Sequence, residues 1–169
     1  SQRRALPDNL WLAELAAGCA ARADRLATAN RDILSQYRRT MEQLYQATAP
    51  DDRAPLLLAM LEEPLAPIRQ LGLQLVENAL IKSERVAPAV SARIVDLLAD
   101  PSADTRGRAA LLIDRLRPEG AGARVAEALL RETDPEVAGR LLGALRSWPT
   151  PVARDVMLKW LEFSDPSVR

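Results

Sequence analysis

Arginine and acidic side chains that recur at turns are the residues of this sequence best suited to specific binding chemistry. Arg69 and Arg106 each stand five residues after a proline, and an acidic residue, Glu63 or Asp100, comes directly before that proline. Arginine holds a carboxylate in a planar fork of hydrogen bonds. We therefore expect either fixed ion pairs between neighbouring helices, or arginines that face a ligand.

Side chains that commonly carry catalysis are scarce. The chain has no histidine, which removes the usual general base and the commonest metal ligand. No Gly-rich phosphate loop, nucleophile elbow or metal-spaced cluster appears, and the adjacent carboxylates Glu62 and Glu63 point to different sides of a helix. Cys19 lies on an alanine-rich stripe and is expected to be a small buried side chain. We expect no metal and no cofactor, and the sequence leans away from an enzyme.

The net charge of the chain does not attract it to nucleic acid or to an anionic membrane. The 169 residues include 23 basic and 23 acidic side chains, so the formal net charge is zero. No apolar run approaches the length of about 20 residues that a membrane span needs. Nucleic-acid binding is therefore unlikely, but a basic stripe remains open as an alternative if the second helices gather five arginines on one side: Arg108, Arg115, Arg117, Arg140 and Arg146.

The elements that must position these side chains are helices. Aromatic residues make up only 4% of the chain, and the apolar residues are mainly Leu, Ala and Val, a mixture that favours helix over sheet. Residues 1–49 are expected to form a helical segment that packs on or caps the rest. It is either one long helix or, with a break near Thr28 to Asn30, a pair of helices.

From residue 50 onward the apolar spacing predicts pairs of shorter helices joined by short turns. The predicted pairs are 52–62 with 66–81, 89–98 with 102–116, and 123–131 with 136–147, followed by a first helix at 152–162. In each copy a leucine is followed seven positions later by an apolar or β-branched residue. The four leucines of this frame are Leu61, Leu98, Leu130 and Leu161, and the residues seven positions later are Ile68, Thr105, Val137 and Val168.

Intervals of 37, 32 and 31 residues between the frame leucines are typical of two-helix repeats that stack into a solenoid. The turn sequences resemble those of the HEAT-repeat family, particularly the short bacterial HEAT-like repeats, in which Asp-Pro is followed after a few residues by Val-Arg. Here the motif stands as Asp100-Pro101…Thr105-Arg106 and as Asp165-Pro166-Ser167-Val168-Arg169. The copy that begins at Glu63-Pro64 has Glu for Asp, and the copy that begins at Asp134-Pro135 lacks the arginine. The resemblance covers residues 51–169.

This resemblance implies an all-α fold, a right-handed α-α superhelix with about three complete repeats and a fourth truncated one. In the family, turn aspartates and arginines form a ladder of ion pairs along the stack. The matching positions here are Arg69, Asp100, Arg106, Asp134, Asp165 and Arg169. Ala138 breaks the arginine series, so that Arg140 substitutes for it or the ladder is interrupted there.

The resemblance says almost nothing about activity, but stacked helices hold a broad surface rigid, so we expect a non-catalytic scaffold that binds another protein through the concave surface of its second helices. Candidate contacts are Gln70, Gln74, Arg108, Arg115 and Arg140. The alternative is a nucleic-acid-binding protein, or one similar to the DNA glycosylases built on HEAT-like repeats, which use aromatic side chains and a carboxylate in a basic groove. Of the three tryptophans, Trp11, Trp148 and Trp160, the last two lie on core stripes, where packing explains them. Because the fourth repeat is unfinished, we expect either a fragment of a longer protein or self-association through that end.

Overall fold

The computed structural model describes residues 30–146, 148, 154–156 and 158. The described residues form helices and the turns that join them, and they contain no strand. The all-α prediction is therefore confirmed. Of the expected break near Thr28 to Asn30, only Asn30 lies within the described residues. Residues 30–47 are helical.

The chain divides into two compact units between Leu44 and Tyr45, before the boundary at residue 49 that the sequence analysis placed. Side-chain contacts of Tyr45 account for its place in the second unit. Its ring is buried, with the guanidinium of Arg53 4.7 Å from the ring centroid, and burial raises the pKa of its hydroxyl. Arg53 Nε also donates to the carbonyl oxygen of Thr48 at 3.0 Å, so α2 holds the residues that precede it.

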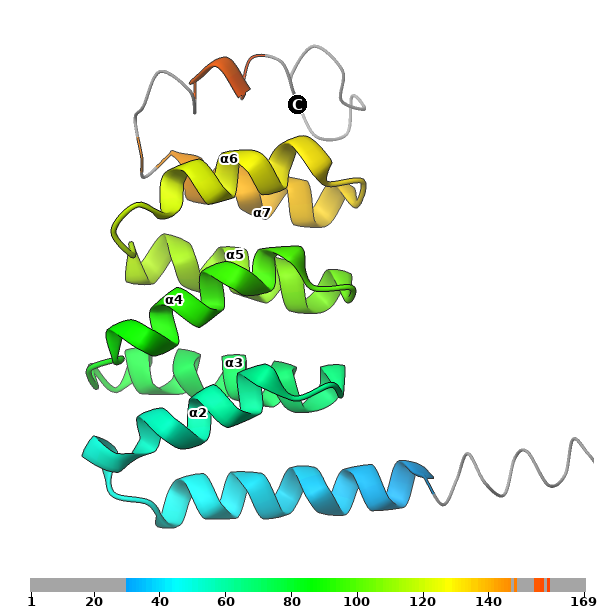
Figure 1. Ribbon diagram of the computed structural model, residues 1–169, viewed down its shortest axis with the longest axis vertical. Coiled ribbons are helices and arrows are strands. Elements are labelled where there is room, and N and C mark those ends of the chain that lie inside the picture. The colour runs from blue at the N-terminus through cyan, green and yellow to red at the C-terminus, as the bar shows by residue number, and fades with distance from the viewer. Residues whose placement is uncertain (1–29, 147, 149–153, 157, 159–169) are drawn as a thin grey trace, which may run out of the picture. The chain divides into compact units, whose positions relative to one another are not determined.

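The second unit consists of helix pairs whose bounds lie close to those expected from the apolar spacing (Figure 1). The first pair is α2 (Arg53–Glu62) and α3 (Ala66–Ile81), preceded by the 3-10 turn η1 (Pro50–Asp52). The second is α4 (Pro88–Asp96), with the 3-10 turn η2 (Leu97–Ala99), and α5 (Ala103–Leu116). The third is α6 (Ala121–Arg131) and α7 (Pro135–Leu145). Residues 154–156 and 158 are also helical.

Local sequence explains where several helices begin and end. Proline occupies one of the first two positions of α3, α4 and α7, where its missing N–H costs no helical hydrogen bond. The Ser102 hydroxyl accepts from the Thr105 N–H at 3.4 Å and so caps α5. At the other end of α5, Arg117 turns the chain with φ 47°, and Gly120 enters α6 with φ 73°.

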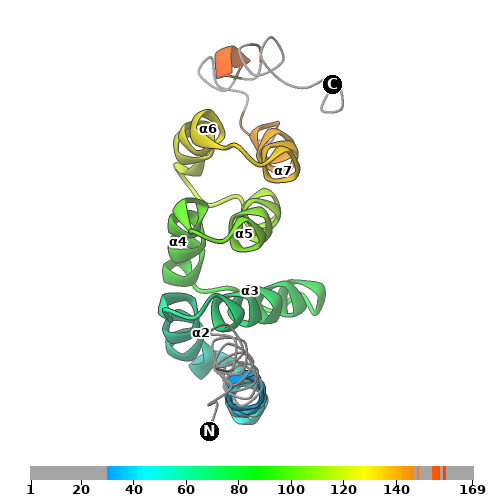
Figure 2. The ribbon, with the colours of Figure 1, turned by 90° about the vertical axis from the view of Figure 1, so that its right-hand side faces the viewer.

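The helices of this unit form two layers, with α2, α4 and α6 in one and α3, α5 and α7 in the other (Figure 2). Each pair packs within itself, and α5 also packs against both α3 and α7. Apolar side chains from both layers meet between them. The largest fully buried ones are Met60, Leu61, Ile68, Leu71, Leu73, Leu75, Val76, Ile94, Ile113, Leu129, Leu141 and Leu145.

Two glycines allow close approach between elements. A Cβ at Gly72 of α3 would lie 3.1 Å from Leu61 Cδ2 and 3.2 Å from Met60 Cβ, so α2 and α3 pack closely there. A Cβ at Gly122 of α6 would lie 3.0 Å from both Cβ and Cγ of Trp148. Trp148 therefore packs on α6, but it is half-buried and is not part of the buried core. Trp11 and Trp160 lie outside the described residues.

One frame leucine is not a core residue. Leu61 and Leu98 are buried, but Leu130 is 52% exposed, and its neighbour Leu129 is fully buried instead. Leu61 and Leu98 are covered because the following helix pair packs beside them, through α4 and α6 respectively. Within the described part of the chain, α6 and α7 are the last complete pair, so no further pair covers Leu130 there. The prediction that Leu130 belongs to the core is therefore wrong.

Candidate functional site

Arg69 of α3 joins two successive turns through a buried ion pair. Its Nε and Nη2 donate to Asp100 Oδ2 and Oδ1 at 2.6 and 2.9 Å, and both residues are less than 10% exposed. Its Nη1 donates to the carbonyl oxygens of Glu63 and Pro64, each at 2.7 Å. Asp100 Oδ1 also accepts from the Ser102 N–H at 2.9 Å. One guanidinium thus binds its own turn and the turn of the next pair.

Arg106 of α5 repeats this geometry one helix pair later, with Glu132 as its partner. Its Nε and Nη2 donate to the two Glu132 carboxylate oxygens, each at 2.8 Å, and Nη1 donates to the carbonyl oxygens of Asp100 and Pro101 at 3.0 and 3.2 Å. The bond from Arg106 holds the pKa of the Glu132 carboxyl below its ordinary value of 4.5, helped by the backbone N–H groups of Asp134 and Thr133. The same bond raises the pKa of Arg106.

Asp134, which the sequence analysis assigned to the ladder, instead caps α7. Its Oδ1 accepts from the N–H groups of Glu136 and Val137 at 2.9 and 3.1 Å. Glu132 was not among the predicted ladder residues, although its position in the sequence gives a signal. Glu63, Asp100 and Glu132 stand six residues before Arg69, Arg106 and Ala138. The proline of the third turn, Pro135, is displaced from this register and follows Asp134, so the Asp-Pro motif indicated Asp134 instead of Glu132. Asp165 and Arg169 lie outside the described residues.

Arg140 does not reach a turn carboxylate in the described structure. Its Nη2 pairs with Glu136 one turn earlier on α7. Its guanidinium lies over Gly107 of α5, where an added Cβ would come within 2.7 Å of Nη1. Arg140 therefore packs across the contact between α5 and α7, and within the described residues the two-turn geometry of Arg69 and Arg106 is not repeated at Ala138.

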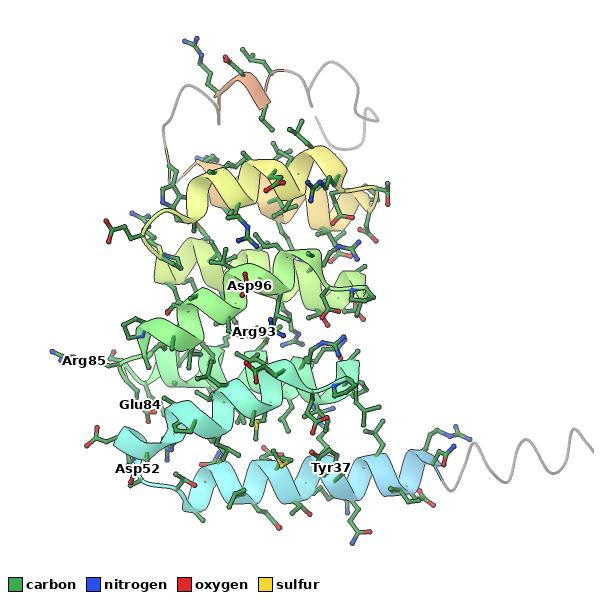
Figure 3. The ribbon with its side chains drawn as sticks, in the orientation of Figure 1. Tyr37, Asp52, Glu84, Arg85, Arg93 and Asp96 are labelled. Carbon is green, nitrogen blue, oxygen red and sulfur yellow. The ribbon has the colours of Figure 1, made fainter. Side chains whose placement is uncertain are left out.

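A second set of contacts links the helices of the other layer. Arg93 of α4 donates to the Leu61 carbonyl oxygen at the end of α2 at 3.3 Å, and Arg124 of α6 donates to Asp96 of α4 at 3.2 Å. Arg93 and Asp96 lie close together on α4 (Figure 3), with 3.9 Å between Arg93 Nη1 and Asp96 Oδ2. Arg93 Nε is buried without a hydrogen-bond partner. These contacts also run between successive helix pairs.

Two grooves lie beside α4 and α6, and Arg124 lines both. One has a volume of about 690 Å³, and its lining includes Leu98, Ala128 and the charged residues Arg106 and Glu132. The other, of about 570 Å³, extends from Val86 and Pro88 to Arg124. Trp148 lines neither groove. Both linings mix apolar and charged side chains, and the ladder residues form part of the larger one.

The predicted binding residues lie on the second-helix layer with unequal exposure. Gln70 and Gln74 of α3 are half-buried, Arg108 and Arg115 of α5 are exposed, and Arg140 of α7 is half-buried. Arg108 and Arg115 share one carboxylate, that of Glu77 on α3, with distances of 3.9 Å to Oε2 and 3.2 Å to Oε1. The sequence analysis did not single out Glu77, because its partners lie on a different helix.

Replacing Glu132 with glutamine should remove a pH-dependent part of the stability. The folded-state pKa of this carboxyl is lowered, so its contribution is complete above the ordinary value of 4.5 and is lost as pH falls through the lower folded-state value. At neutral pH we expect Glu132→Gln to lower the free energy of unfolding by about 1–3 kcal/mol. Urea unfolding at a series of pH values measures this. A wild-type advantage over Glu132→Gln that does not shrink as the pH is lowered from neutrality into the acid range would contradict the assignment.

Comparisons with protein-family models, with curated proteins and with solved structures found no match to this chain. Among the described residues there is no group of three or more His, Cys, Asp or Glu side chains placed to hold a metal ion. Within the same part of the chain, no helix has both the length and the apolar character needed to cross a membrane. The geometry of the helix pairs is therefore the basis for a functional assignment.

Proposed function

We propose that residues 50–169 form a HEAT-like solenoid, a right-handed α-α superhelix, that serves as a non-catalytic scaffold for binding another protein. The observation that carries this proposal is the repeated contact of Arg69 with Asp100 and of Arg106 with Glu132. In each contact the Nε and Nη2 atoms of an arginine bind a carboxylate of the next helix pair, as expected for a stack of equivalent repeats.

The ladder also supports a binding role through rigidity. A surface whose helices are already fixed loses little conformational freedom when a partner docks, so more of the contact energy appears as affinity. Arg69 and Asp100 are buried, and Glu132 keeps only 3% of its side chain exposed, so most of the hydrogen-bonding groups of these pairs are already used within the fold. We propose that the solvent-facing side chains of α3, α5 and α7 bind the partner.

Two exposed leucines allow a matched test of which layer binds. Leu111 of α5 is 44% exposed and Leu130 of α6 is 52% exposed, so aspartate at either position should leave the core intact. We expect affinity capture from an extract of the source cells to retain a partner with the wild-type chain and with Leu130→Asp. Leu111→Asp should reduce that capture by about tenfold or more, because it places a charge within the interface.

Three results would count against this scaffold. Loss of the partner with Leu130→Asp but not with Leu111→Asp would move the binding surface to the first-helix layer. Failure to retain any protein stoichiometrically would argue against the scaffold itself. Binding of duplex DNA that weakens steeply with salt would favour the nucleic-acid alternative, for which the exposed Arg108 and Arg115 are the specific support.

A further inference from the structure

We propose that the outer face of α5, with the adjoining faces of α3 and α7, is a docking site for an acidic segment of a partner protein. This inference rests on the scaffold proposed above and names the chemistry of its partner. Arg108, Leu111 and Arg115 occupy the exposed side of α5 at helical spacings of three and four residues. An exposed leucine between two arginines offers one apolar contact flanked by two cationic ones.

The two arginines keep hydrogen-bonding capacity that their neighbours do not use. Arg115 Nη1 lies 3.2 Å from Glu77, whereas Arg108 Nη1 lies 3.9 Å from it, which is beyond hydrogen-bond distance. The Arg115 side chain remains 52% exposed and the Arg108 side chain 44% exposed. By contrast, the guanidinium groups of Arg69 and Arg106 each bind one carboxylate through two nitrogens. Among Glu77, Arg108 and Arg115, the two positive charges thus outnumber the one negative charge.

The register of the repeats places a glycine beside this site. Gln74, Leu111 and Gly143 each stand eleven residues after the turn carboxylates Glu63, Asp100 and Glu132, so they occupy equivalent positions on α3, α5 and α7. Gly143 is exposed, and no atom lies within 4 Å of a Cβ added there. The α7 position that corresponds to Leu111 therefore has no side chain, which leaves Leu111 accessible from that side.

Charge and polarity favour a carboxylate-bearing partner over nucleic acid. Leu111 lies at the centre of the site and makes no favourable contact with a phosphate group. A partner segment with an apolar side chain next to a glutamate or aspartate could place the apolar side chain on Leu111 and the carboxylate on an arginine guanidinium. A helical or extended segment that alternates acidic and apolar residues would contact Arg108 and Arg115 with its acidic side chains and Leu111 with its apolar ones.

Fluorescence anisotropy with two labelled peptides tests this site. One short helical peptide carries glutamate and leucine at helical spacing, and its twin has glutamine in place of every glutamate. We expect the wild-type chain to bind the glutamate peptide about tenfold more tightly than the twin, and increasingly weakly as salt is added. The double variant Arg108→Gln/Arg115→Gln should lose that preference, while circular dichroism reports an unchanged fold.

The matched control is Arg124→Gln/Arg131→Gln on α6, which removes two arginines whose side chains are 53% and 75% exposed. It should bind the glutamate peptide as the wild type does. Equal loss in both double variants, equal binding of both peptides, no binding of either peptide, or displacement of the peptide by an excess of duplex DNA would each overturn the acidic-segment proposal.

The capture experiment separates this inference from the scaffold proposal. A natural partner that depends on Leu111 but is retained by Arg108→Gln/Arg115→Gln would refute the acidic segment and leave the scaffold standing. The absence of any partner that depends on Leu111 would instead refute binding through the second-helix layer.

Discussion

Replacing Arg69 with alanine is expected to lower the free energy of unfolding by about 3–5 kcal/mol, because it leaves the buried Asp100 carboxylate without its counter-charge. The carbonyl oxygens of Glu63 and Pro64 lose a donor at the same time. Urea or thermal unfolding followed by circular dichroism measures the change. The effect should exceed that of any exposed ion pair in the described structure, since exposed pairs contribute only about 0–1 kcal/mol.

Arg124→Ala is the control for this prediction. Arg124 pairs with Asp96, but both side chains are about half exposed, so its loss should change stability by less than about 1 kcal/mol. The double variant Arg69→Met/Asp100→Leu removes both buried charges and should be more stable than Arg69→Ala. If Arg69→Ala and Arg124→Ala destabilise the chain equally, the ion pair between Arg69 and Asp100 does not hold the repeats together.

The second large effect is expected at Leu129. Its side chain is fully buried between α6 and its neighbours, so Leu129→Ala should cost about 2–5 kcal/mol through lost burial and an unfilled cavity. Leu130→Ala alters the adjacent, half-exposed leucine with the same change in volume, and should cost less than about 1 kcal/mol. The two equilibrium unfolding curves compare the positions directly, and a larger loss at Leu130 would show that the helix is rotated from the orientation described above.

Apolar periodicity was sufficient to place the helix pairs, because each helix needs one face against the core whatever lies beyond it. The start of α3 at Ala66 and its end at Ile81 coincide with the expected bounds, and Ser102 caps α5 where that helix was expected to begin. Helix bounds depend on residues close in sequence, such as prolines, caps and apolar spacing. Such features can be read before any three-dimensional arrangement is known.

Features that depend on a neighbouring repeat were harder to predict. Leu130 carries the same sequence signal as Leu61, yet its burial depends on a following helix pair that would cover it. Glu132 replaced Asp134 as the partner of Arg106 because the third turn shifts its proline while the carboxylate keeps its register. Glu77 meets Arg108 and Arg115 only across two helices. A single sequence gives no direct signal for such contacts between repeats.

The double attachment of Arg106 has a consequence for how the protein opens. Its Nη1 donates to the carbonyl oxygens of one turn while its Nε and Nη2 donate to Glu132 of the next, so separation of either turn leaves donors of this guanidinium unpaired. Arg69 imposes the same condition one pair earlier. We therefore expect opening of one turn to favour opening of its neighbour, so that the helix pairs from α2 to α7 open cooperatively rather than independently.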